Sequence, residues 1–173
     1  MKKIIIFALA FVCTAASYAQ KEQLKALSFG VGMPIELRDL PGLGVSFNIG
    51  YDCTYPVNDN LAIGFYLTGG GGYWSEFKHY SEIDHTHVCF RLTAGLMMQI
   101  GDLDDKPYLL GISPCTGFGL YDMDMVLPVE VRFGRFITEN WYIMGELTYH
   151  ASLAGETACL EPAIRVGYNF GGK

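Results

Sequence analysis

The sequence predicts an all-β protein, a closed eight-stranded antiparallel up-and-down transmembrane β-barrel that follows an N-terminal signal peptide. Three observations support this fold class. The first residues have the layout of an export signal, eight later segments alternate apolar and polar residues, and lysine almost avoids those segments. A period of two indicates a β-strand, because successive side chains of a strand point to opposite faces of the sheet.

The N-terminus is typical of a secretory signal peptide. Lys2 and Lys3 precede the apolar run IIIFALAFV, and a small-x-small cleavage motif, SYA, ends at Ala19. This order of positive, apolar and small residues is that of an export signal, and the apolar run is too short for a convincing membrane-spanning helix. We therefore expect two parts, a signal peptide at 1–19 and one β-barrel domain at 20–173.

The mature chain is acidic, and its cysteines do not have the spacing of a zinc ribbon. Lys2 and Lys3 leave with the signal, so ten of the 12 basic residues remain against 18 acids, a net charge of −8. We expect no nucleic-acid partner, since phosphates need clustered bases. The remaining cysteines lack paired C-x-x-C spacing and allow three disulfide pairings or free thiols. They are Cys53, Cys89, Cys115 and Cys159.

Alternation predicts eight strands in the mature chain. It is clearest, in chain order, in LGVSFNIGYD, HVCFRLTAGLMMQI, WYIMGELTYHASL and LEPAIRVGYNF, where apolar residues recur at every second position. The residues between them are mostly polar or small, so each strand has one apolar and one polar face. The eight expected strands are 25–33, 42–53, 61–73, 87–100, 107–121, 125–137, 141–153 and 160–170.

The connections fall into short turns at one end and longer loops at the other. YPVND, GDLDD and TEN are expected as short periplasmic turns. An even number of antiparallel strands then brings both ends of the chain to the same side and lets the sheet close, which matters because hydrocarbon cannot satisfy an open sheet edge. The expected outer loops are 34–41, 74–86, the tip at 122–124, and 154–159.

The apolar face of these strands is expected to face lipid. Of the five lysines in the mature chain, Lys25 alone lies in an expected strand, whereas a water-exposed outer face would carry more. The opposite face is rich in Gly, Ala, Ser and Thr, which suits a crowded interior. A soluble lipocalin-like barrel, which would hide its apolar face, is the alternative.

Aromatic residues of the apolar face gather toward the strand ends, as the girdles at two membrane interfaces do. One expected girdle contains Tyr51, Tyr108, Trp141, Tyr168 and Phe170. The other contains Tyr73, Phe90, Phe118 and Tyr149.

The signal peptide, the eight alternating strands and a last strand ending in RVGYNF resemble the small eight-stranded outer-membrane β-barrel proteins of Gram-negative bacteria. These include the OmpA transmembrane domain and the wider outer membrane protein beta-barrel domain family. The resemblance implies a location in the bacterial outer membrane and contacts with its lipid and lipopolysaccharide. It also implies assembly by periplasmic chaperones and the barrel-assembly machinery. We expect a monomer without a cofactor.

The inward face is expected to hold a neutralised ionic cluster, since buried charges are expensive unless they are paired. Centring one turn on Glu139 places Arg132 opposite Glu146. A tight register across the last loop also places Glu146 opposite Arg165. The cluster would either plug the lumen or gate a narrow channel. Its expected members are Arg91, Glu130, Arg132, Glu146, His150, Glu161 and Arg165.

A histidine-rich stretch, HYSEIDHTH, is a candidate metal site in the longest outer loop. Imidazole and carboxylate groups bind zinc or copper, and residues two apart on a strand share a face. Loops are also polar without binding metal. The candidate ligands are His79, Asp84, His85 and His87.

A second motif, His150-x-Ser152 with Glu156 and Glu161 further on, is similar to that of the outer-membrane lipid A deacylases. There a Ser–His–Glu triad activates the serine for ester cleavage. Leu153 stands where that family has Asn, and parity points the first two residues into the lumen. The preferred function is therefore non-enzymatic, a structural or surface-interaction role through extracellular loops with a plugged lumen. The alternatives are a narrow porin-like channel for ions or small solutes and, more remotely, a lipid A hydrolase.

Overall fold

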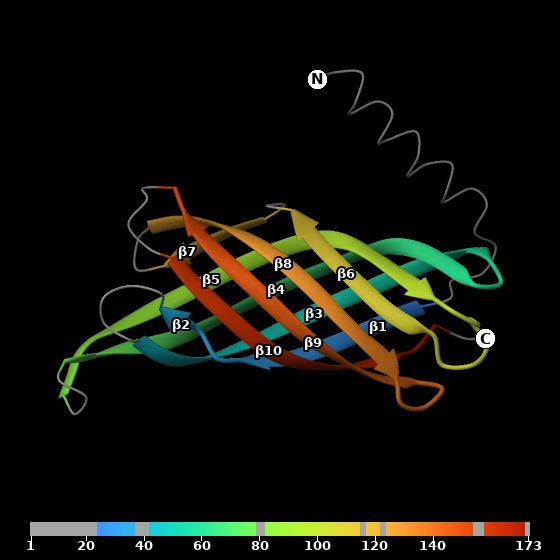
Figure 1. Ribbon diagram of the computed structural model, residues 1–173, viewed down its shortest axis with the longest axis horizontal. Helices are drawn as coiled ribbons and strands as arrows, with labels where there is room; N and C mark the ends of the chain where they lie inside the picture. The colour runs from blue at the N-terminus through green and yellow to red at the C-terminus, as the bar shows by residue number, and fades with distance from the viewer. Residues whose placement is uncertain are drawn as a thin grey trace, which may run out of the picture.

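The computed structural model describes residues 24–36, 42–78, 82–114, 117–121, 124–153 and 158–171 (Figure 1). The predicted signal peptide, 1–19, lies outside these residues. The described part forms β1 (Leu24–Gly32), β2 (Ile35–Glu36), β3 (Gly42–Asn58), β4 (Leu61–Lys78), β5 (Glu82–Ile100), β6 (Tyr108–Pro114), β7 (Gly117–Tyr121), β8 (Asp124–Phe136), β9 (Trp141–Ser152) and β10 (Ala158–Asn169). No helix in the described residues is long and apolar enough to cross a membrane.

The strands form one closed antiparallel barrel. β1 pairs with β3 on one side and with β10 on the other, which closes the sheet. β2 continues the line of β1 between β10 and β3, and β6 and β7 together lie between β5 and β8. The ten strands thus make eight barrel strands, which confirms the all-β, closed eight-stranded antiparallel fold. The expected strand 107–121 is divided into β6 and β7.

Several strands are longer than the alternation predicted. β3 continues to Asn58 through an irregularity between Pro56 and Asn58, the kind of place where a strand accepts proline. β4 continues to Lys78 and β5 begins at Glu82, so the expected loop 74–86 is wrong: most of it is strand. Lys78 therefore ends a strand. The cause is physical, because a strand that extends beyond a bilayer into water needs no apolar face.

The two ends of the barrel differ. We call the end with the short connections at 59–60, 101–107 and 137–140 the turn end, and the opposite end the loop end. In Figure 1 the C-terminus lies at the turn end, and the β4–β5 hairpin projects from the loop end beyond the other strands.

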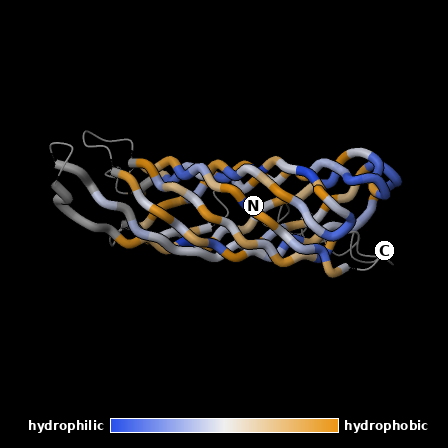
Figure 2. Tube along the Cα trace, turned by 90° about the horizontal axis from the view of Figure 1, so that it is seen from below, coloured by the Kyte–Doolittle hydropathy of each residue, from blue (hydrophilic) through white to orange (hydrophobic). Residues whose placement is uncertain are grey.

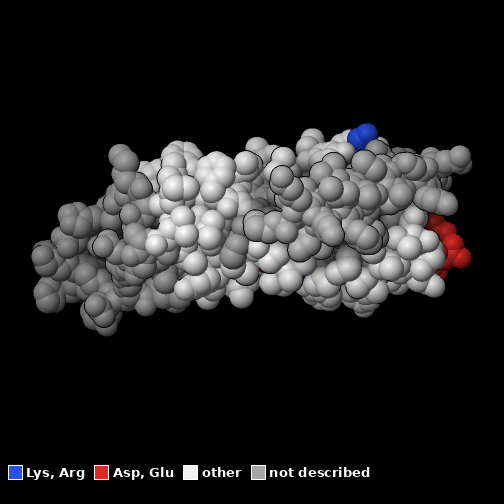
Figure 3. Space-filling model, turned by 90° about the horizontal axis from the view of Figure 1, so that it is seen from above, with Lys and Arg blue, Asp and Glu red and all other residues white. Residues whose placement is uncertain are grey.

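Apolar side chains cover the outside of the barrel, and polar ones fill its inside. Phe47, Ile49, Phe90 and Ile164 are at least half exposed, whereas Arg132 and Arg165 are completely buried. Figure 2 shows this alternation of orange with white and blue along the strands. The described surface that Figure 3 shows is mostly uncharged, and its blue and red groups lie mainly toward one end. This sense of alternation is that of a membrane barrel and is opposite to that of the lipocalin-like alternative.

Candidate functional site

The candidate site is the lumen, where charged side chains from facing strands meet. Arg91 comes from β5, Arg132 from β8, and Arg165 from β10. Each projects inward because it occupies the inward parity of its strand. All three guanidinium groups are paired with carboxylates, as the cost of burying charge requires.

Glu146, on β9, is the centre of this cluster. Its carboxylate lies 2.7 Å from a guanidinium nitrogen of Arg91 and 2.8 Å from one of Arg165. Nε of Arg132 lies 3.4 Å away. One carboxylate thus binds side chains from three other strands, which ties opposite walls of the barrel together.

Arg132 has a second set of partners. Its Nε donates to Glu130 at 2.5 Å, and a terminal nitrogen donates to the hydroxyl of Thr68 at 2.5 Å. Another terminal nitrogen lies 3.4 Å from Asp52. The guanidinium carbon lies 3.7 Å from the ring centroid of Tyr66, a cation–π contact in a site without water-exposed area.

Glu161 is the centre of the part nearer the loop end. It accepts a hydrogen bond from Ser46 at 2.5 Å and pairs with Arg91 at 3.0 Å. His150 Nε2 lies 3.1 Å from Oε2, the same carboxylate oxygen that Arg91 contacts. Arg165 adds hydrogen bonds to Ser28 and to Asn48 of the first barrel strands. The network therefore joins β1, β3, β4, β5, β8, β9 and β10.

An apolar layer lies between the ionic cluster and the turn end. The ring of Tyr142 packs edge-on against Phe136 at 5.5 Å, and its hydroxyl donates to Asp52. Glycines make room for these rings: a Cβ at Gly167 would overlap Tyr142, and one at Gly95 would overlap Tyr66. The buried members of the layer are Leu24, Ala26, Tyr66, Met97, Leu109, Phe136, Tyr142 and Met144.

The structure brings all seven expected cluster residues together, but with a different strand register at one hairpin. Arg132 is opposite Glu146, as expected. Glu146, however, is opposite Ala163, so the expected backbone register between β9 and β10 is wrong by two residues. The contact with Arg165 forms nonetheless, because the long arginine side chain spans the offset and a shift of two keeps every residue on its face.

Sequence reasoning missed part of the lumen. Asp52 is completely buried and contacts Arg132, which brings the buried carboxylates to four against three arginines and His150. Its position in LGVSFNIGYD has inward parity, so the signal was present. Tyr66 and Tyr142 were also missed. Both have inward parity, but an aromatic residue on a polar face does not by itself predict a lumen layer.

The candidate metal ligands and the cysteines lie partly outside the described residues. Of the candidate metal ligands, His79 lies outside the described residues, and Asp84, His85 and His87 lie in the β5 backbone without described side chains. No group of three or more metal-binding side chains occurs among those that the structure does describe. Cys53, Cys89 and Cys159 are buried, whereas Cys115 is outside the described residues, so the thiol pairing stays a prediction.

The candidate hydrolase residues also lie partly inside and partly outside the described part. His150 is completely buried inside the barrel, where it contacts Glu161. The side chain of Ser152 and the whole of Glu156 are outside the described part.

The residues of the expected girdles lie on the outer surface. Trp141 and Tyr168 contact each other at 5.0 Å between ring centroids, and Tyr108 stacks on Phe133 at 5.9 Å. Tyr51 is half-buried beside Phe65. The other expected members are exposed: Tyr73, Phe90, Phe118, Tyr149 and Phe170.

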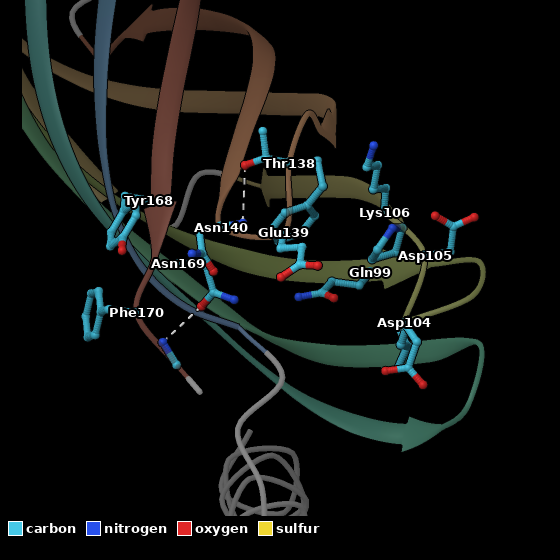
Figure 4. A pocket seen from close by; sticks show the side chains of 14 residues that line it. Gln99, Asp104, Asp105, Lys106, Thr138, Glu139, Asn140, Tyr168, Asn169 and Phe170 are labelled. Carbon is cyan, nitrogen blue, oxygen red and sulfur yellow. Dashed lines mark hydrogen bonds between the residues drawn. The ribbon is translucent and has the colours of Figure 1, made fainter. Parts of the chain in front are cut away.

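The turn end of the barrel contains a pocket of about 450 Å³. The turns at 101–107 and 137–140 and the end of β10 surround it, as Figure 4 shows for Asp104, Glu139 and Asn169. Buried Gln99 belongs to its lining and donates a hydrogen bond to Thr54 at 2.9 Å.

Comparison with known proteins gives matches among solved structures only. No protein-family model matches the chain, and no curated protein matches it. Ail, the attachment invasion locus protein of Yersinia pestis, is 17% identical with a TM-score of 0.57, over 87% of this chain and 99% of that chain. Its complex with the heparin analogue sucrose octasulfate is 15% identical with a TM-score of 0.58, over 87% and 100%.

The outer membrane enzyme PagL is 8% identical with a TM-score of 0.58, over 83% of this chain and 99% of that chain. At such identities these likenesses show the fold, which is that of the small eight-stranded outer-membrane β-barrels. The narrower OmpA-like label stays a prediction.

Proposed function

We propose that this chain is a non-enzymatic protein of the bacterial outer membrane, with a structural or surface-interaction role at its loop end. The predicted signal peptide, 1–19, would export it, and the barrel-assembly machinery and periplasmic chaperones would insert it as an up-and-down monomer among lipid and lipopolysaccharide. The observation that carries the proposal is the filled lumen, since a barrel that conducts nothing must act through its surfaces.

Side chains fill the lumen by their volume as well as by their charges. Eight strands enclose a space that side chains alone can fill. Here Arg132 and Arg165 are completely buried in the middle, and Tyr66 and Tyr142 are completely buried next to the turn end. Two layers of different chemistry thus close the same passage, which favours a plug over a channel.

The loop end supplies a surface for interaction. β5 pairs with β4 from Glu82 onward, but its pairing with β7 begins only at Cys89. The hairpin therefore extends beyond the neighbouring described strands (Figure 1). The likeness to Ail, an attachment invasion locus protein, supports a surface role, whereas PagL is an enzyme with the same fold. The buried place of His150 favours the non-enzymatic alternative, because a lipid-acting group must reach the membrane.

Planar-bilayer recording of the chain refolded without its first 19 residues tests the plug. We expect stable insertion, seen as a compact species that heating unfolds on a gel, with no discrete current steps. Discrete steps that change in Glu146→Ala would instead support the narrow porin-like channel.

Lipid A analysis tests the absence of enzymatic activity. Expression in a Gram-negative host should leave the acylation of lipid A unchanged. Loss of an acyl chain that depends on both His150 and Ser152 would overturn the non-enzymatic proposal.

A further inference from the structure

Among the described side chains, charge on the outer face of the barrel occurs at one rim only. At the outward strand positions with a described side chain, the residue is apolar, aromatic or glycine, except for Ser75 toward the loop end and two bases, Lys25 and Arg135. Both lie near the turn end, close to the girdle residues Tyr108, Trp141 and Tyr168. The described outer face thus has basic but no acidic residues, and they lie where lipid phosphates would be.

The guanidinium group of Arg135 has hydrogen-bond donors available for a ligand. It is exposed on β8, opposite Tyr108 on one side and Ile143 on the other. Its Nε donates a long hydrogen bond of 3.4 Å to the carbonyl of Lys106. None of the ion pairs between described residues includes it, in contrast to the three arginines of the lumen.

Aromatic rings and a second base surround this guanidinium. Its carbon lies 5.2 Å from the ring centroid of Tyr108, which in turn stacks on Phe133 with an interplanar angle of 12°. Lys106 is exposed next to them in the turn, with a φ of 51°. We call Lys106, Tyr108, Phe133 and Arg135 the Arg135 patch. It combines two cations with an apolar floor that continues into the lipid-facing band.

We propose that the Arg135 patch binds the phosphate of an anionic phospholipid, such as phosphatidylglycerol, in the leaflet that meets the turn end. The proposal rests on the proposed membrane insertion. A guanidinium presents a planar fork that matches phosphate oxygens, and a long basic side chain can place its charge at the interface while its stem lies on apolar surface. The acyl chains would then lie over Phe133.

Nearby acids do not remove this preference. Asp104, Asp105 and Glu139 belong to the turns and line the pocket at the barrel mouth, and Lys106 belongs to the same lining. Arg135, by contrast, is the penultimate residue of β8 and faces outward between Tyr108 and Ile143 on the neighbouring strands. Each base near a lipid surface favours anionic lipid by about fivefold.

Quenching of Trp141 fluorescence by brominated lipid tests the proposal. Trp141 is two residues from Ile143, the partner of Arg135, on the same outer face. The sequence contains two tryptophans, so Trp74→Phe leaves Trp141 as the single reporter. Vesicles of phosphatidylcholine would contain a minor fraction of brominated phosphatidylglycerol or of brominated phosphatidylcholine. Native mass spectrometry of lipid adducts on the unmodified chain repeats the comparison without the Trp74 substitution.

We expect phosphatidylglycerol to be enriched at least about fivefold near Trp141, since both bases of the patch add to the preference. Arg135→Gln should lower this enrichment by about fivefold, Lys106→Gln should lower it by a smaller factor, and the control Lys78→Gln at the other end of the barrel should leave it unchanged. Inserted protein with equal quenching by both lipids would overturn the inference and leave the proposed function intact. Protein that inserts in neither vesicle would overturn both.

A free phosphate ion is the other source of the same chemistry. If inorganic phosphate abolished the preference more strongly than sodium chloride at equal ionic strength, the patch would be a site for the free anion, and the assignment to lipid would be wrong. Equal effects of the two salts support the lipid.

Discussion

Glu146 shows how one residue can determine the state of the whole lumen. Among the described side chains it alone contacts Arg91, Arg132 and Arg165. A buried ion pair adds little net stability when it is complete, but removal of one partner leaves the other charge uncompensated. Loss of the Glu146 carboxylate is therefore expected to lower the stability of the fold, because it leaves the three buried arginines without this partner.

Glu146→Gln should destabilise the folded barrel by about 3–5 kcal/mol, the range for a broken buried ion pair. The shape of the side chain is kept, so the loss is electrostatic. Urea unfolding in lipid vesicles, followed by tryptophan fluorescence, measures it. Glu139→Gln, in an exposed turn, is the control and should change the free energy of unfolding by less than about 0.5 kcal/mol. Equal midpoints for both variants would show that the cluster is not held by this carboxylate.

Gly167 illustrates a steric requirement at the same scale. A methyl group there would overlap the ring of Tyr142, whereas one at Gly145 would find its nearest neighbour, the carbonyl of Phe133, at 3.9 Å. Gly167→Ala should therefore cost about 1–3 kcal/mol, as overpacking does. Gly145→Ala is the matched control and should be nearly neutral. Tyr142→Leu in the Gly167→Ala background should recover part of the loss in a double-mutant cycle. Independent, additive effects would contradict the contact.

At the scale of strands, parity was predictable and register was not. Because side chains alternate with a period of two, the inward position of each of the seven predicted cluster residues follows from its strand alone. Register depends on the geometry of the connection, and the offset that places Glu146 opposite Ala163 could not be read from the residues between β9 and β10. Parity alone also did not show which inward residues belong to the ionic cluster, since Asp52 had the inward position and was still overlooked.

Strand length was the other property that alternation did not reveal. The apolar pattern ends where the lipid-facing band ends, but β4 and β5 continue to Lys78 and from Glu82. The hairpin beyond Trp74 is stabilised by backbone pairing, and its sequence, with Glu and Lys, has the composition of a loop. The apolar alternation in the sequence thus defines the membrane-spanning part of each strand and not the full length of the strand.

The projecting part of the β4–β5 hairpin should be dispensable for the barrel. Its last described pairs, Phe77 with Ile83 and Lys78 with Glu82, lie beyond the pairing of β5 with β7. Replacement of 77–83 by an Asn-Gly turn should leave the free energy of unfolding within about 0.5 kcal/mol of the parent, the usual effect of a surface change. Heat modifiability on gels and urea midpoints measure this. A variant that no longer forms the heat-modifiable species would place the hairpin in the folding core.

At the scale of the whole molecule, two layers close the lumen in series. The ionic cluster lies in the middle, and the apolar layer with Tyr66 and Tyr142 lies toward the turn end. The charged layer joins strands on opposite walls, and the apolar layer excludes water without any charge. Ions should therefore pass only when both layers are removed. Each layer is built from several strands, so it exists only in the assembled barrel.

Arg132→Ala together with Glu146→Ala removes one charge of each sign from the ionic layer and leaves its balance unchanged. The missing side chains should open a polar cavity that fills with water, yet the apolar layer should keep the barrel silent in planar-bilayer recording. Adding Tyr142→Ala should remove that second seal, so the triple variant should show discrete current steps where the double variant shows none. Lys106→Ala with Glu139→Ala, in the exposed turns, is the charge-balanced control and should stay silent. Steps in the double variant would mean that the ionic cluster is the only seal. Silence in a triple variant that inserts normally would mean that the remaining arginines, Arg91 and Arg165, close the passage by themselves.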